Sequence, residues 1–205
     1  FTYSDADFAG CPRTLRSTSG IQINIEGPKT CFPITARSLR QPLVAYSTPE
    51  AEVVALNLAA RTLTLPAIDL WEVLLPPGFW SRFMEDNQAT IQILKTGRNP
   101  TLRYLGRSQG ICIQQLYELL TVYAPRNRIE LEYLDTDLMV ADIHTKAFTA
   151  KEKWLHAIFL INVLRLQDHD SRIKFHHEKF VPLVPKPKIN MPGGRTVQGN
   201  RFGHD

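Results

Sequence analysis

Four acidic residues, each in a short recognisable context, are the side chains of this sequence best suited to chemistry: Asp5, Glu52, Asp86 and Asp142. Carboxylates a few ångströms apart repel one another and do not all ionise easily. Divalent cations such as Mg²⁺ take carboxylate ligands, and two cations held by shared carboxylates can activate a water and stabilise the leaving oxygen of a phosphodiester. The four acids therefore predict a site of metal-dependent phosphodiester hydrolysis, if the fold gathers them.

Each acid alone also has a purely structural interpretation. Asp7 faces the same side of a strand as Asp5, so either could serve, and a solvated turn would explain both. Asp86 precedes an expected helix, where an aspartate is a common cap. Asp142 lies in the first turn of another expected helix, where an acid suits the helix dipole. The functional interpretation depends on all four acids together, in this order along the chain.

Helix geometry separates Glu52 from its neighbour Glu50. The segment Ser47–Glu50 offers a hydroxyl cap, a proline in the first turn and an acid, which predicts the start of a helix that runs to about Leu65. Glu52 shares a face with the apolar stripe that must pack on the sheet, formed by Leu56, Ala59 and Leu63. Glu50 falls on the solvent-facing side. Glu52 is therefore the site candidate, and Glu50 is more simply a capping acid.

The rest of the chain supplies elements that would position the acids. Apolar alternation and turn residues predict five strands, at residues 1–5, 21–25, 30–36, 79–85 and 128–134. Helical patterns cover residues 47–65, 87–95, 111–122 and most of 139–166. The order predicts an α/β domain with a five-stranded mixed sheet flanked by helices. The acids fall at strand ends and helix starts, where open sheets usually bind ligands.

We expect one domain over residues 1–166 and a flexible basic tail over residues 167–205. The second segment has prolines, glycines and scattered charge without a sustained period, a composition typical of disorder. A group of histidines and aspartates in it could form a metal tract, but the spacing fits no zinc finger. We therefore interpret this group as tail residues: Asp168, His169, Asp170, His176 and His177.

The composition narrows the class of protein. The apolar content of 43% is ordinary for a globular protein, and the net charge of +4 is a mild sign of a polyanionic partner. Three cysteines without a Cys-x-x-Cys pair favour reduced thiols in an intracellular protein. We find no apolar run long enough to span a membrane and expect no membrane partner. Because the chain opens on Phe1 rather than Met, we expect a piece of a longer protein.

A stretch without acidic residues extends from Asp86 to Glu118. Lysine and arginine side chains there would neutralise nucleic-acid phosphates, and Tyr104 among them could contact sugar or base. The stretch is the best candidate for a nucleic-acid-binding surface, with a solvated basic loop as the alternative. Its basic residues are Lys95, Arg98, Arg103 and Arg107; the next candidates are Arg13, Arg16, Lys29, Arg37 and Arg40.

The contexts of the four acids resemble the ribonuclease H domain of copia-type retrotransposon Pol polyproteins. The matching segments are Tyr3-Ser4-Asp5-Ala6-Asp7-Phe8-Ala9-Gly10-Cys11, Arg16-Ser17-Thr18-Ser19-Gly20, Ser47-Thr48-Pro49-Glu50-Ala51-Glu52, Asp86-Asn87-Gln88 and Ala141-Asp142-Ile143-His144-Thr145-Lys146. The resemblance covers most of the expected domain. It implies an RNase H-like fold that lies downstream of a reverse transcriptase domain, its partner in the parent polyprotein.

The resemblance also implies an activity and its cofactors. The expected reaction is cleavage of the RNA strand of RNA–DNA hybrids during reverse transcription, in a cytoplasmic particle or in the nucleus. The cofactor would be two Mg²⁺ ions, with Mn²⁺ as a substitute. The family's four catalytic and metal-binding acids correspond to Asp5, Glu52, Asp86 and Asp142.

Two segments depart from the patterns of related enzymes. Copia-type chains commonly carry Lys-His-Ile-Asp downstream of the Asp-Asn-Gln motif, where this chain has the segment Arg107–Cys112, so substrate contacts there differ. Cellular ribonucleases H place a histidine in the loop before the last aspartate. The segment Asp135–Ala141 has none, and His144 follows Asp142. Proton transfer at product release would then need water or another group.

Two rival functions fit part of the pattern. A retroviral-type integrase or transposase core shares the implied fold but places its glutamate last, whereas here the glutamate is second and an aspartate is last. The non-enzymatic alternative is a catalytically inactive or repurposed retrotransposon fragment that binds nucleic acid. Metal-dependent cleavage of an RNA–DNA hybrid would distinguish these functions.

Overall fold

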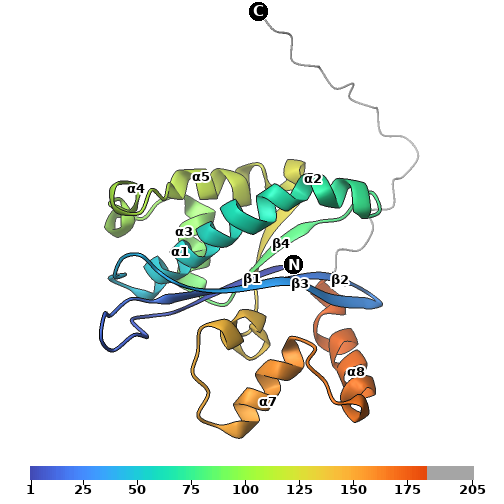
Figure 1. The fold of residues 1–205 in the computed structure, drawn as a ribbon. Coiled ribbons are helices and arrows are strands. Elements are labelled where there is room, and N and C mark those ends of the chain that lie inside the picture. The colour runs from blue at the N-terminus through green and yellow to red at the C-terminus, as the bar shows by residue number, and fades with distance from the viewer. Residues whose placement is uncertain (184–205) are drawn as a thin grey trace, which may run out of the picture.

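A five-stranded mixed sheet forms the centre of the fold in the computed structural model, which describes residues 1–183 (Figure 1). The strand order is β3-β2-β1-β4-β5. The first three strands form an antiparallel meander, and β1, β4 and β5 run parallel. The strands are β1 (Thr2–Asp7), β2 (Thr18–Gly27), β3 (Thr30–Arg40), β4 (Ser81–Glu85) and β5 (Ile129–Tyr133). The α/β class and the five-stranded mixed sheet predicted from the sequence are confirmed.

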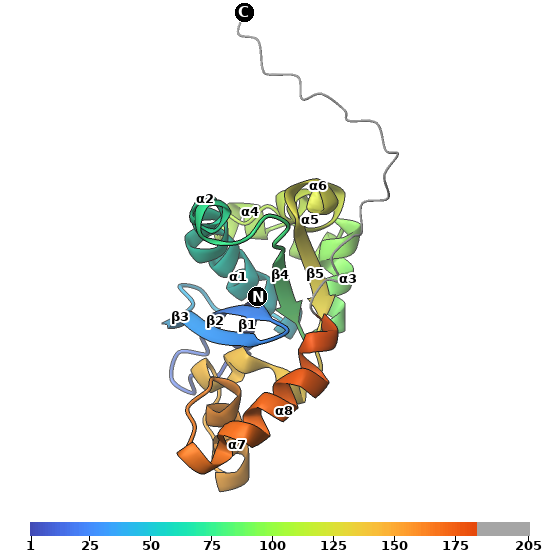
Figure 2. The ribbon, with the colours of Figure 1, turned by 90° about the vertical axis from the view of Figure 1, so that its right-hand side faces the viewer.

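Helices cover both faces of this sheet (Figures 1 and 2). One face carries α1 (Thr48–Ala59), α2 (Leu65–Leu74), α3 (Gln88–Thr96), α4 (Leu105–Ser108), α5 (Ile113–Tyr117) and α6 (Ala124–Asn127). The other carries α7 (Lys151–Leu160) and α8 (His169–Lys179). Short 3₁₀ helices are Pro100–Leu102, Thr136–Leu138, Val140–His144, Leu166–Asp168 and Val181–Leu183, and π-helical turns are Ala60–Thr64 and Glu118–Val122.

The sheet separates two hydrophobic clusters, because successive strand residues point to opposite faces. Phe83 of β4 packs with Leu56 of α1 and Leu94 of α3 on one side. The next residue, Met84, packs with Tyr3 and with residues from the C-terminal third of the chain on the other side, including Phe180. The central strands β1 and β4 are therefore buried on both faces, while the edge strand β3 is largely exposed. The ends of the central strands are the places where polar groups can meet.

The helix that begins at Thr48 is longer than predicted. The Ser47 hydroxyl accepts a hydrogen bond from the Glu50 backbone N–H at 3.3 Å, which confirms the predicted cap. The expected end before Pro66 is wrong, because the π turn Ala60–Thr64 continues the helix into α2. Pro66 lies in the first turn of α2, where the missing N–H of a proline costs little.

The continuous helix Thr48–Leu74 also changes the expectation about membranes. It is 27 residues long and contains a stretch with a mean hydropathy of 1.4, so it is long and apolar enough to cross a membrane by length and composition alone. The sequence-based statement that no run is long enough is therefore wrong on that criterion. Core helices of soluble proteins pass the same test, and α1 buries Val53 and Leu56 between itself and the sheet.

Residues 169–183, expected in a flexible tail, are folded onto the domain. Helix α8 buries Arg172 and His176, and Phe180 just beyond it is 1% exposed. The predicted domain end at residue 166 is therefore wrong, while the rest of the expected tail, residues 184–205, lies outside the described residues. The expected helix over residues 139–166 is instead a 3₁₀ helix, a loop and α7.

Candidate metal centre

Four elements bring acidic side chains to one end of the sheet. Strands β1 and β4 are parallel neighbours in which Tyr3 lies opposite Met84, so Asp5 near the end of β1 and Asp86 directly after β4 lie at the same end of the sheet. Helix α1 contributes Glu52, and the 3₁₀ helix Val140–His144 contributes Asp142. The carboxylates of all four predicted site residues converge here.

The carboxylates form two groups that share one residue. Ligand oxygens of Asp5, Asp86 and Asp142 lie within 4.8 Å of one another. A second group with the same spacing consists of Glu52, Glu85 and Asp86. Asp86 belongs to both, which is the arrangement that two cations bridged by a shared carboxylate require.

Glu85 was not predicted as part of the site. We expected its side chain on the opposite face of β4 and exposed, but it is completely buried. One carboxylate oxygen accepts a hydrogen bond from the Asn87 N–H at 3.1 Å. The other, Oε2, is buried without a partner among the described residues. The chain turns from β4 into α3 directly after Glu85, so strand alternation no longer sets the side-chain directions there.

Helix geometry identified Glu52 correctly and misplaced Glu50. Glu52 is 3% exposed and faces the other acids, as predicted. Glu50, expected on the solvent-facing side of the helix, is also buried. Its carboxylate accepts hydrogen bonds from the Tyr46 N–H at 2.8 Å and from the Tyr104 hydroxyl. Glu50 therefore acts at the helix start, as predicted, but is covered by the α4 region.

The structure also distinguishes Asp5 from Asp7, the two aspartates of β1 that could have served in the site. The Asp7 carboxylate accepts a hydrogen bond from the Thr18 backbone N–H and thereby closes the β1–β2 hairpin. Asp5 instead accepts a hydrogen bond from the Thr145 hydroxyl and belongs to the acidic cluster. Asp5 is therefore the candidate ligand on β1.

Burial and mutual repulsion raise the pKa values of several of these acids above their usual range. Burial, followed by the charges of Glu85 and Asp5, raises the pKa of Glu52 to about 11. Burial likewise raises the pKa of Glu85 well above its usual range and the pKa of Asp86 above its ordinary value. Burial and then Asp5 raise the pKa of Asp142 to about 6. The cluster therefore holds protons unless positive charge is supplied.

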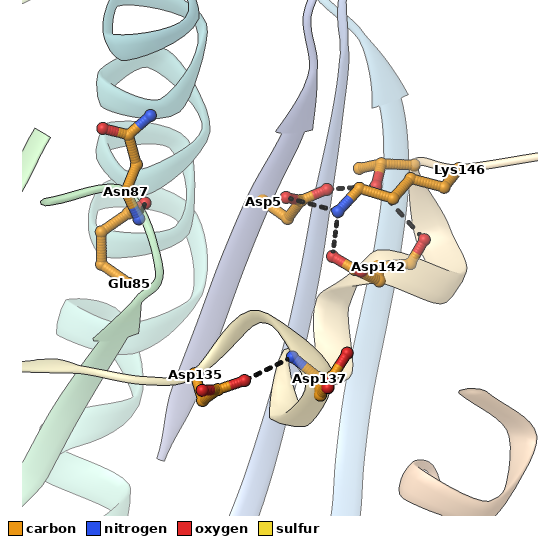
Figure 3. Close-up of polar contacts among 8 residues, drawn as sticks. Asp5, Glu85, Asn87, Asp135, Asp137, Asp142 and Lys146 are labelled. Carbon is orange, nitrogen blue, oxygen red and sulfur yellow. Dashed lines mark hydrogen bonds and ion pairs between the residues drawn. The ribbon is translucent and has the colours of Figure 1, made fainter. Parts of the chain in front are cut away.

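Lys146 supplies part of that charge (Figure 3). Its Nζ lies 2.7 Å from Asp142 Oδ1 and 3.6 Å from Asp5 Oδ1. Burial alone would lower the pKa of this ammonium, but the two carboxylates outweigh burial and raise the pKa. An ammonium is thus held against two members of the first group.

The chemistry of the donors fits hard divalent cations. All five acids offer oxygen ligands, which Mg²⁺ prefers. Oε2 of Glu52, like Oε2 of Glu85, is buried and has no hydrogen-bond partner in the described part of the chain. Buried carboxylate oxygens without a donor are costly, and a bound cation would satisfy both.

The four predicted nucleic-acid-binding residues come from α3, from α4 and from the segment between them. Lys95, Arg98, Arg103 and Arg107 are all exposed, and two of them, Arg98 and Arg103, line the same pocket. Tyr104, expected to contact sugar or base, instead donates its hydroxyl to Glu50 and packs its ring against Tyr46.

The loop between β5 and Asp142 contains no histidine, as the sequence shows. The nearby His144 does not face the acids, since its Nε2 lies 2.9 Å from Gln22 Oε1. Burial lowers the pKa of His144. The imidazole therefore forms a hydrogen bond that holds the 3₁₀ helix Val140–His144 against β2.

Comparisons of the chain with protein-family models, with curated proteins and with solved structures found no match.

Proposed function

We propose that the acidic cluster is the catalytic centre of a ribonuclease H-type endonuclease that cleaves the RNA strand of RNA–DNA hybrids. The observation that carries this proposal is the pair of carboxylate groups joined by Asp86, each with ligand oxygens within 4.8 Å. The segments around these acids resemble copia-type ribonuclease H domains, and the mixed sheet flanked by helices is compatible with the RNase H-like fold that this resemblance implies.

Each acid has a definite part in this proposal. Asp5, Asp86 and Asp142 would hold one Mg²⁺, and Glu52 and Glu85 would hold a second one together with Asp86. Bound cations would lower the pKa of a water and neutralise charge on the leaving oxygen. The protein's contribution is to fix the ligands on buried strand and helix ends, so that little reorganisation is needed.

The exposed basic residues of α3 and α4 are the proposed contact to the hybrid backbone. The Tyr104–Glu50 hydrogen bond ties this region to the first turn of α1, two residues from Glu52. A phosphate backbone that follows Arg103 and Arg107 would therefore lie near the acidic cluster. Lysine and arginine contacts of this kind position nucleic acid without reading its sequence.

Hydrolysis of a labelled RNA–DNA hybrid tests the proposal directly. We expect cleavage of the RNA strand in Mg²⁺ or Mn²⁺, none in EDTA, and little on single-stranded RNA or on duplex DNA. Asp86→Asn removes the shared charge and keeps the size of the side chain, so it should lose nearly all activity while remaining folded by circular dichroism. Asp137→Asn, at an exposed acid outside both groups, is the matched control and should keep full activity.

The same assay separates the nuclease from a fragment that only binds nucleic acid. Hybrid binding without cleavage in either metal, by folded protein, would support the inactive alternative. Cleavage that survives Asp86→Asn would remove Asp86 from the mechanism and contradict the two-cation site.

A further inference from the structure

A second cluster of metal-ligating side chains lies at the other end of β2, away from the acidic site. Glu26 is near the end of β2, Cys31 is near the start of β3, and His176 is on α8. Their ligand atoms lie within 4.8 Å of one another. The cluster joins the β2–β3 hairpin to a helix whose sequence gave no sign of packing.

His176 has the environment of a metal-ligating imidazole. It is 5% exposed, and its Nε2 lies 3.0 Å from the Gly27 carbonyl oxygen. A carbonyl only accepts, so Nε2 carries the proton and donates it. In the neutral ring Nδ1 is then the nitrogen with a free lone pair, and it is buried with no hydrogen-bond partner in residues 1–183. Metal-bound histidines usually donate their second N–H to a backbone carbonyl or carboxylate in this way.

Glu26, like His176, is fixed by hydrogen bonds at one atom and has a second atom without a partner. One carboxylate oxygen, Oε1, accepts hydrogen bonds from the Tyr3 hydroxyl at 2.6 Å and from Asn24 Nδ2 at 3.0 Å. The second oxygen, Oε2, is buried and lacks a partner among the described residues. The carboxylate is thus fixed in orientation and has one ligand atom free, as a second shell around a metal site would arrange it.

Cys31 completes the group with a soft ligand. Its Sγ lies 3.3 Å from Asn162 Nδ2 and 3.4 Å from Arg172 Nη2, and both donors stabilise a thiolate. Burial, followed by the charge of Glu26, raises the pKa of the thiol, so without a metal the sulfur keeps its proton. A divalent cation would reverse this, because it binds thiolate directly.

Arg172 lies beside this centre. Its Nε donates to the Phe159 carbonyl at 3.1 Å and its Nη2 to the Leu160 carbonyl at 3.2 Å. The guanidinium carbon also lies over the rings of Phe175 and Phe180. These contacts hold the guanidinium between α7 and α8, where it borders the sulfur and leaves the free atoms of Glu26 and His176 unpaired.

We propose that Glu26, Cys31 and His176 bind a transition-metal cation of the zinc class, which fastens α8 to the β2–β3 hairpin. One nitrogen, one sulfur and one oxygen ligand form a set that Zn²⁺ accepts, with a fourth position left for water. Bonds of about 2.0–2.3 Å place tetrahedral ligands roughly 3.5 Å apart, so the three side chains need to close inward by only a small movement. Mg²⁺ would not be favoured, because it prefers oxygen ligands only.

Cobalt binding to the full, reduced chain tests this site independently of nuclease activity. The protein is stripped with EDTA, placed in excess Mg²⁺ to fill the acidic cluster, and titrated with Co²⁺. We expect a thiolate-to-cobalt charge-transfer band in the near ultraviolet that saturates at one equivalent and disappears when Zn²⁺ is added. The acidic cluster has no sulfur and cannot produce this band.

Variants locate the ligands. Cys31→Ser should abolish the band, and His176→Gln should weaken binding at least tenfold. The matched controls are Cys112→Ser, at an exposed cysteine outside the site, and His177→Gln, at the exposed histidine next to His176. Both controls should bind normally. Tyr3→Phe removes only the hydrogen bond to Glu26 and should weaken binding roughly ten- to a hundredfold. Zn²⁺ should raise the melting temperature of the wild-type chain but not that of Cys31→Ser.

Two results would overturn the proposal. One is the absence of a charge-transfer band in folded wild-type protein at excess Co²⁺. The other is a band of full strength in Cys31→Ser, which would assign the sulfur ligand to another cysteine. Neither result bears on cleavage of hybrids, so this proposal and the nuclease proposal can fail separately.

Discussion

At the scale of single residues, the acidic cluster lowers the stability of the folded protein when no metal is bound. Five carboxylates meet there, and Lys146 pairs with two of them, Asp5 and Asp142. Burial, followed by the neighbouring like charges, raises the pKa values of Glu52 and Glu85, and both effects oppose folding with these acids ionised. Such a site is expected where function, rather than stability, determines the residues.

Glu85→Gln tests whether the fifth acid is a ligand. The glutamine can still accept the hydrogen bond from the Asn87 N–H, but it carries no charge. We expect the metal-free variant to melt at a higher temperature than wild type, because repulsion is relieved. Mg²⁺ affinity measured by calorimetry should fall at least ten- to a hundredfold, the loss typical even of residues that only support a ligand. Unchanged affinity, with Asp137→Asn as the control, would leave Glu85 outside the coordination shell.

The sequence identified four of the five acids because each sits in a local motif. Glu85 was missed because strand alternation assigns it the face opposite to Asp86, whereas the backbone leaves the strand between them. Glu50 was predicted to be exposed because the residues that cover it, Tyr46 and Tyr104, come from segments without a helical or strand pattern. Burial by residues that are distant in the sequence cannot be predicted from the local hydrophobic pattern of a helix or strand.

At the scale of elements, the 3₁₀ helix Val140–His144 positions Asp142 by lying against β2. The His144 ring contacts Gln22, and the Ser38 hydroxyl donates to the His144 carbonyl at 2.6 Å. Gly20 of β2 leaves room for this element. A Cβ there would come within 2.5 Å of Thr145 Cγ2 and 2.8 Å of the Ala141 carbonyl oxygen. The glycine is thus required by close packing of two backbones.

Gly20→Ala should therefore displace the 3₁₀ helix and its aspartate. We expect a loss of roughly 1–3 kcal/mol in unfolding free energy, typical of overpacking, together with a drop in hybrid cleavage. Gly27→Ala in the same strand is the matched control, since its nearest contact would be Thr30 Cβ at 3.9 Å. Chemical denaturation and activity are both measured, and equal stability of the two variants would contradict the packing argument.

The elements that the sequence predicted best are those with simple periods and caps. Helix α3 lies close to the helix expected over residues 87–95 and ends at the left-handed Gly97. Its cap is Asn87 rather than Asp86, which the structural interpretation of that acid had offered as the cap. Helix α8 escaped prediction because the side chains it buries, Arg172 and His176, are polar. Arg172 donates hydrogen bonds to carbonyls of α7, and His176 Nε2 pairs with the Gly27 carbonyl at the end of β2. The passage from α1 into α2 was missed because a π turn allows Pro66 to sit at a new helix start.

At the scale of the whole molecule, the raised pKa values predict how stability depends on pH. The metal-free folded state binds protons at Glu52 and Asp142 more tightly than the unfolded chain, since their folded pKa values are about 11 and about 6. Their contribution to stability is therefore complete below their unfolded pKa values and is lost as the pH rises through the folded ones. We expect the melting temperature in EDTA to fall between pH 5 and pH 8.

Mg²⁺ should reverse that trend. The cation binds deprotonated carboxylates, so its stabilising effect should grow with pH. In Glu52→Gln the fall of the melting temperature in EDTA should be shallower, because a buried carboxyl with a strongly raised pKa is removed. Melting curves at several pH values, with and without Mg²⁺, measure both effects. A wild-type melting temperature in EDTA that rises from pH 6 to pH 8 by more than that of Glu52→Gln would contradict the assignment.

The basic surface formed by Lys95, Arg98, Arg103 and Arg107 should set the affinity for the hybrid at the scale of the whole molecule. Replacing all four with alanine should weaken hybrid binding regardless of base sequence, because phosphate contacts carry no sequence information. The log–log dependence of affinity on salt should flatten by roughly 0.7–0.9 for each phosphate that is no longer neutralised. Mg²⁺ affinity at the acidic cluster should be unchanged, since none of the four side chains is a ligand.

A second quadruple variant makes this result specific. It replaces four exposed basic residues on other elements: Arg61, Arg126, Lys174 and Lys179. Its net charge is the same as that of the first variant, so a general electrostatic effect would weaken binding equally in both. A larger loss and a flatter salt dependence in the α3–α4 variant would locate the hybrid there. Equal slopes would instead direct the search to the remaining candidates on and between β1, β2 and β3, which are Arg13, Arg16, Lys29, Arg37 and Arg40.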